Sequence, residues 1–108
     1  MISRHAIDYW FEMMCGFIQR KLNDGVKIEI IDGAINDLDG EVYGFTQTNC
    51  NCPVVISKQS NRVATLIHEF LHKMFPDQEE DFIQNLEKEL IVTFTTEQQD
   101  MLNKFLDI

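Results

Sequence analysis

The sequence predicts one small α+β domain that spans residues 1–108. Its 108 residues are 44% hydrophobic, which is enough apolar material for a single core. Apolar residues recur three and four positions apart in several segments, which is the spacing of amphipathic helices, and three shorter segments are rich in β-branched residues. Together these patterns predict helices packed against one small sheet.

The first element is an amphipathic helix over Ser3–Leu22, which the turn residues 23–25 bring to an end. Three segments rich in β-branched residues follow, and turn residues separate them. We expect three short strands in one sheet, at Val26–Ile31, Glu41–Thr46 and Pro53–Ser57.

The remaining segments are predicted to be helical. Apolar residues follow a helical spacing over Asn61–Phe75, which predicts a second helix packed on the core. A third helix is expected from Asp77, because Asp is a good N-cap and Glu80, three positions later, completes a capping box. Thr95 or Thr96 would cap a last, C-terminal helix.

Charge and cysteine content exclude several function classes. Nine basic and eighteen acidic residues give a net charge of −9, which repels phosphate backbones, so we expect no nucleic-acid partner. No apolar run approaches the roughly 18 residues that cross a bilayer, and no signal peptide is evident, so we expect a cytoplasmic protein without a membrane partner. The cysteines, Cys15, Cys50 and Cys52, are odd in number, which predicts reduced thiols.

The predicted second helix contains the pattern His-Glu-x-x-His, formed by His68, Glu69 and His72. Residues four apart lie on one helical face, so both imidazoles can bind one zinc ion at about 2.0–2.1 Å. Glu69 then lies beside the metal, where it can act as general base toward a water whose pKa zinc lowers to about 7. Ordinary packing is the alternative interpretation, although the full pattern arises by chance in roughly a few per thousand chains of this length.

A catalytic zinc site usually has three protein ligands and a water, so a third ligand is expected. Glu79 precedes the apolar residues of the third helix by three, four, seven and eleven positions, which places it on the packed face and makes it the predicted ligand. Glu80 is the alternative, although the capping box would occupy it. An acidic first turn that suits the helix dipole would explain these residues without a metal.

These residues resemble a gluzincin, the metallopeptidase class in which an HExxH helix is followed by a helix that supplies a glutamate ligand. The order of elements over about Val26 to Leu90 is similar to that of minigluzincins and of the ImmA/IrrE-type metallopeptidases of bacteria, phages and mobile elements. The resemblance implies a zincin-like fold with a three-stranded sheet beside the active-site helix. It also implies that a strand such as Val54–Ser57 lines the cleft and binds substrate by strand addition.

The same resemblance implies a zinc metalloendopeptidase that acts on a protein or peptide substrate, with His68, His72 and Glu79 as zinc ligands and Glu69 as the base. We expect a monomer or weak oligomer, in the bacterial host cytosol if the chain is phage-encoded. No His or Tyr follows His72 to stabilise the oxyanion, which departs from larger gluzincins. The alternative is a catalytically inactive zincin-fold protein that binds a host protein through its acidic surface.

The pair Cys50 and Cys52 lies just before the predicted cleft strand. A thiolate there could bind the zinc and keep the enzyme latent, since sulfur is a good zinc ligand. Two loop cysteines without a metal role are the simpler interpretation.

Overall fold

The computed structural model describes residues 3–33, 35–37, 40–42, 44–46, 51–58 and 60–106, and in these ranges it shows both helices and strands. The elements in chain order are α1 (Arg4–Asn23), β1 (Ile28–Ile31), β2 (Ile35–Asp37), β3 (Gly40–Val42), β4 (Gly44–Phe45), β5 (Val54–Ser57), α2 (Arg62–Met74), α3 (Glu80–Thr93), α4 (Thr96–Asn103) and the short 3-10 helix η1 (Lys104–Leu106). The predicted α+β class is confirmed. No helix in the described ranges is long and apolar enough to cross a membrane.

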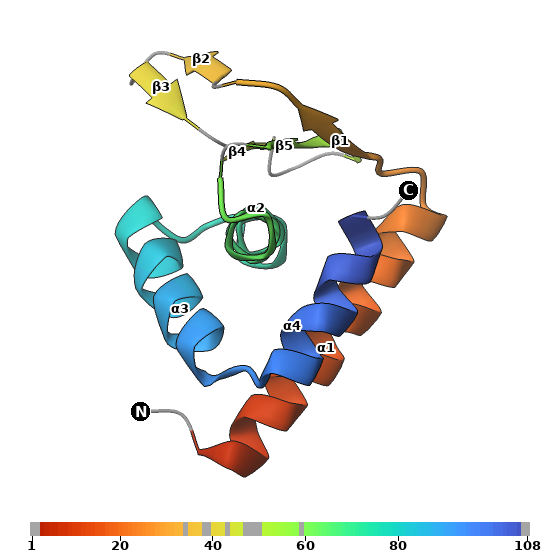
Figure 1. Cartoon of the computed structure of the whole chain (residues 1–108), viewed down its shortest axis with the longest axis vertical. Helices are drawn as coiled ribbons and strands as arrows, with labels where there is room; N and C mark the ends of the chain where they lie inside the picture. Colours follow the sequence, from red (N-terminus) through yellow and green to blue (C-terminus); the bar gives the residue numbers. More distant parts are fainter. Residues whose placement is uncertain are drawn as a thin grey trace.

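Helix α2 occupies the centre of the fold. Figure 1 shows it end-on, with β1, β5 and β4 on one side of it, α3 on a second side and α1 and α4 on a third. It contacts α1, α3, α4, β4 and β5. Its apolar residues Leu66, Ile67, Phe70 and Leu71 are fully buried. The predicted helix Asn61–Phe75 is confirmed, with Asn61 as the N-cap residue.

The main sheet is built on a parallel pair of four-residue strands. Strands β1 and β5 run parallel, with Ile28 opposite Val54, and β4 pairs antiparallel with the other edge of β5, with Gly44 opposite Ile56. Strands β2 and β3 form a separate antiparallel hairpin. The expectation of three strands in one sheet is therefore met only in part, because the third strand has two residues and the hairpin was not predicted.

Strand β5 lies in the middle of this sheet rather than at a free edge. Strand β1 pairs with one of its edges and β4 with the other, and Val54, Ile56 and Ser57 are buried. The expectation that Val54–Ser57 accepts a substrate strand is therefore wrong, since β1 lies along one edge of β5 and β4 pairs with Val55 and Ile56 on the other. In the strand order β1-β5-β4, the end strand on this side is β4.

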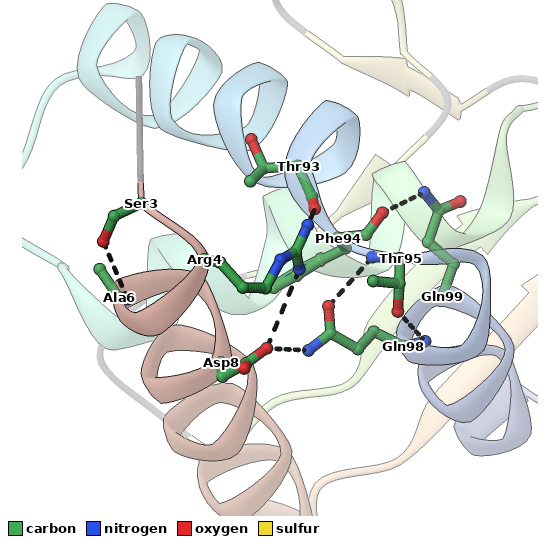
Figure 2. Close-up of polar contacts among 9 residues, drawn as sticks. All are labelled: Ser3, Arg4, Ala6, Asp8, Thr93, Phe94, Thr95, Gln98 and Gln99. Carbon is green, nitrogen blue, oxygen red and sulfur yellow. Dashed lines mark hydrogen bonds and ion pairs between the residues drawn. The ribbon is translucent and has the colours of Figure 1, made fainter.

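Helix α1 confirms the predicted N-terminal helix, and Ser3 caps it by accepting a hydrogen bond from the Ala6 amide at 3.2 Å. Its start is tied to the junction of α3 and α4 (Figure 2). Arg4 donates a hydrogen bond to the Thr93 carbonyl at 3.2 Å, and Gln98 donates one to Asp8 at 2.8 Å. These contacts hold the C-terminal end of α3 against α1.

Two helix starts differ in how well local signals predict them. Thr95 caps α4 in a full capping box with Gln98, which confirms the prediction for the last helix. The prediction that Asp77 caps the third helix is wrong, because α3 begins at Glu80 and its N-cap residue is Glu79. Asp77 instead lies in a turn after α2 that the hydrogen bond from the Gln78 amide to the Phe75 carbonyl closes, at 3.1 Å.

The cysteines are in different states. Cys15 is a free thiol in α1, whereas Cys52 is disulfide-bonded. Cys50 lies outside the described residues. The expectation of reduced thiols is therefore wrong for Cys52, since an odd count of cysteines still allows one pair. A sulfur in a disulfide is not a thiolate, so Cys52 in this state does not serve as the zinc ligand of the latency hypothesis.

Candidate metal centre

The structure brings the three residues of the HExxH pattern together on α2. One potential ligand atom from each of His68, Glu69 and His72 lies within 4.8 Å of the others, a grouping that could hold a metal ion. The imidazoles are partly exposed, at 17% and 19% of their side-chain surface, and Glu69 is buried. The two imidazoles are therefore more exposed to solvent than the Glu69 carboxylate is.

A fourth residue, Glu80 at the start of α3, completes the cluster. The Nε2 atoms of His68 and His72 are 3.2 Å apart, and their rings meet edge to face. Glu80 spans both nitrogens, because its Oε1 is 2.8 Å from Nε2 of His68 and its Oε2 is 2.8 Å from Nε2 of His72. Two nitrogens and one carboxylate thus converge on one point.

Either protons or a cation can satisfy this convergence. Each Nε2 carries at most one proton. If both do, each donates to a different oxygen of Glu80 at 2.8 Å; if one is bare, it can accept from the other ring across 3.2 Å. A cation attracts all three groups at once, since imidazole lone pairs and carboxylate oxygens are both ligands for metal ions.

Glu79, the predicted third ligand, is exposed, and the contact to the histidines is made by Glu80 instead. The prediction assumed that Glu79 follows the helical spacing of α3. As the N-cap residue it has an extended backbone, at φ −73° and ψ 159°, so that spacing does not apply to it. The packed side of α3 is also rotated toward Glu80, because Phe82 is 44% exposed while Ile83, three residues after Glu80, is fully buried.

Glu69 is 6% exposed and lies under strand β4. A Cβ atom placed on Gly44 would collide with Cγ2 of Thr65 and lie 3.3 Å from both Cγ and Oε1 of Glu69, so only glycine allows the strand to pass this closely. Burial raises the pKa of Glu69 to about 8; the negative charge of Glu80 adds to the increase, and the charge of Lys73 opposes it. A buried carboxylate with a shifted pKa beside two histidines is typical of an acid–base site.

Two further charged residues lie around the cluster, and the sequence pattern had assigned neither of them to the site. Lys73, four residues after Glu69, is 6% exposed, and burial lowers its pKa. Glu87 of α3 has its Oε1 3.9 Å from Nδ1 of His68, and burial raises its pKa. The signal for Glu87 was its spacing of seven from Glu80, which places both on one side of α3. Burial also lowers the pKa of His68, so its neutral, ligand-competent form is favoured.

The arrangement therefore offers a cation two imidazole nitrogens and a carboxylate, with a second, buried carboxylate alongside. No protein-family model, no curated protein and no solved structure matches the chain.

Proposed function

We propose that the protein is a zinc-dependent metalloendopeptidase that hydrolyses peptide bonds of a protein substrate. The observation that carries the proposal is the convergence of His68, His72 and Glu80 on one point, with Glu69 beside them. The resemblance of the HExxH helix and the acidic start of the next helix to those of gluzincins supports the same reading, now with Glu80 in the ligand position.

The distance between the two histidine nitrogens fits zinc. Two nitrogens bound at about 2.0–2.1 Å in a tetrahedral site lie about 3.3–3.4 Å apart, and the Nε2 atoms of His68 and His72 are 3.2 Å apart. A carboxylate ligand would lie about 3.3–3.5 Å from each nitrogen. Glu80, at 2.8 Å from each, would have to withdraw slightly, and its side chain is 54% exposed and therefore has room to do so.

Glu69 is the residue that would move the proton. Zinc, when bound, supplies Lewis acidity that makes water a nucleophile near neutral pH and polarises a carbonyl. In its carboxylate form Glu69 would accept a proton from the water as the water oxygen attacks the peptide carbonyl carbon. The positive charge of a bound zinc would favour this form over the protonated form that burial favours in the metal-free protein. The carboxyl group then passes the proton to the leaving nitrogen as the C–N bond breaks. Its burial under Gly44 keeps bulk water from competing for that proton.

The surroundings favour an extended, basic substrate segment. Asp77, Glu79 and Asp81, next to the cluster in sequence, are exposed, and the chain carries a net charge of −9. Strand β4 passes over Glu69 and ends the sheet on that side, so it is the strand beside which a substrate segment would lie. Equal cleavage of matched acidic and basic peptides would contradict this preference.

The first test is metal content, measured by elemental analysis on protein purified without chelator or nickel. We expect about one zinc per chain, lost in His68→Ala and reduced in Glu80→Gln. Glu79→Gln is the matched control, since it removes a neighbouring exposed charge and should retain the zinc. A wild-type protein that binds no metal when zinc is supplied would contradict the proposal.

The second test separates an enzyme from a binding protein. Glu69→Gln should keep the zinc and lower the rate of hydrolysis of a peptide library by about 100- to 10,000-fold. Glu79→Gln should cleave like the wild type. If Glu69→Gln retains the biological effect of the protein in its host, the chain acts by binding rather than by hydrolysis.

A further inference from the structure

Helix α3 presents two carboxylates to the two nitrogens of one imidazole. Oε1 of Glu80 lies 2.8 Å from Nε2 of His68, and Oε1 of Glu87 lies 3.9 Å from its Nδ1. The two glutamates are seven residues apart, which is two helical turns, so they lie along the same side of α3. His68 is therefore held between them.

The two nitrogens of a metal-binding imidazole have different tasks. One binds the metal through its lone pair, and the other carries the proton, whose acceptor fixes the tautomer and the orientation of the ring. Nε2 of His68 faces His72 and Glu80, so Nδ1 is the nitrogen that must hold the proton in the metal-bound form. Glu87 is the carboxylate that faces Nδ1.

The position of Glu87 differs from that of an ordinary surface glutamate. Its side chain is 20% exposed, whereas Glu89, two residues later, is exposed. Burial of a carboxylate is unfavourable without a partner, and the Nδ1–H group of His68 is a donor that can compensate for it. The 3.9 Å distance is longer than a hydrogen bond. A side-chain rotation that moves the Glu87 carboxylate by about 1 Å would bring it within hydrogen-bond distance of Nδ1.

We propose that Glu87 is a positioning residue that accepts the Nδ1 proton of His68 and so directs Nε2 of that ring toward the metal. This role rests on the proposed zinc site, because the ring is directed toward the metal. The orientation of the ring does not depend on hydrolysis and can be measured without an activity assay. Glu87 faces Nδ1 of His68, whereas the ligands converge at Nε2, so it would act through the His68 ring.

Zinc affinity is the first readout, measured by competition with a chromophoric chelator. Glu87→Ala should weaken zinc binding about 10- to 100-fold, the effect typical of an outer-shell partner of a histidine ligand. Glu87→Gln should weaken it less, because its amide oxygen still accepts a hydrogen bond. Glu89→Ala is the matched control on the same helix and should bind zinc like the wild type.

The tautomer of His68 is the second readout, measured by nitrogen-15 NMR of the imidazole in metal-free protein at mildly alkaline pH, where the ring is neutral. The measurement uses Glu80→Ala as background, because Glu80 competes for the proton at Nε2. In that background Nδ1 should carry the proton, and adding Glu87→Ala should reduce this tautomer while adding Glu89→Ala should not.

The zinc affinity and the His68 tautomer test the positioning role of Glu87 separately from the proposed function. If Glu87→Ala leaves both the zinc affinity and the tautomer unchanged, Glu87 has no positioning role. Weaker zinc binding with an unchanged tautomer would also overturn the inference, since Glu87 would then act through its charge alone. If the wild type binds no zinc, the proposed function fails and the tautomer measurement alone decides the role of Glu87.

Discussion

Replacing Glu69 with glutamine should stabilise the metal-free protein, and the gain should grow with pH. Folding raises the pKa of Glu69 from an ordinary value of 4.5 to about 8, chiefly through burial. The folded state therefore holds this proton more tightly than the unfolded state does, and the resulting stability is full below about pH 4.5 and is lost as the pH rises through about 8. Glutamine has the same shape and does not titrate, so it avoids this loss.

The size of the effect follows from the two pKa values. One pKa unit corresponds to about 1.4 kcal/mol, so a carboxylate charged in both states would cost about 5 kcal/mol of unfolding free energy well above pH 8. At about pH 7 the expected difference between Glu69→Gln and wild type is about 3 kcal/mol, and at about pH 5 it is under about 1 kcal/mol. With 6% of Glu69 exposed, solvent screens little of this cost.

Urea unfolding of chelator-treated protein at about pH 5 and about pH 8 measures the difference, because the extrapolated free energy of unfolding is linear in denaturant. Glu79→Gln, which removes an exposed carboxylate, is the control and should show no comparable change. The lowered pKa of His68 affects wild type and Glu69→Gln alike and cancels in the comparison. A difference that stays constant between the two pH values would refute the reasoning.

Three further predictions concern packing, capping and thiol reactivity. Gly44→Ala should lower the free energy of unfolding by about 1–3 kcal/mol, because the new methyl group would collide with Thr65. Gly16→Ala, in open space on α1, is the control and should be neutral or stabilising. Equal urea midpoints for the two variants would contradict the close approach of β4 to α2. Thr95→Ala should cost about 1 kcal/mol by removing the cap of α4, visible as a lower melting temperature; an unchanged melting temperature would mean that the capping box contributes nothing. Burial raises the pKa of Cys15 to about 11, so alkylation followed by mass spectrometry at mildly alkaline pH should be slow in the folded protein and fast in urea; equal rates would contradict this burial.

Helices were predictable where their signals are local. Ser3 and Asn61 cap helices that were predicted to begin at those residues, and Thr95 caps a helix as predicted, because a capping side chain bonds to an amide two or three residues away. The sheet was less predictable because β1 pairs with β5 across the intervening hairpin. Strand pairing of this kind depends on contacts between distant segments, which no local pattern encodes.

The HExxH residues were predictable for the same local reason, since one helix fixes the spacing of His68 and His72. The carboxylate that contacts both histidines, Glu80, comes from another helix, and predicting it depended on where that helix begins. Asp77 is the better N-cap by intrinsic preference, a term of about 1 kcal/mol. In the structure Asp77 lies in the turn after α2, so it does not cap α3. The burial of Ile83 determines which side of α3 packs, and burying such a side chain stabilises the fold by about 1.5–3 kcal/mol. Tertiary packing therefore outweighed the local signal.

The burial of Glu69 departs from the pattern of the helix that carries it. Helix α2 packs on several sides, and an apolar residue at this position would avoid the cost of burying a carboxylate. Such departures from a consistent core are expected at functional sites. A Glu69→Gln protein that is more stable at alkaline pH, binds zinc and no longer cleaves peptides would show that the cost serves hydrolysis. If the same variant is more stable but no peptide is cleaved even by the zinc-loaded wild type, the buried carboxylate serves the metal site without hydrolysis.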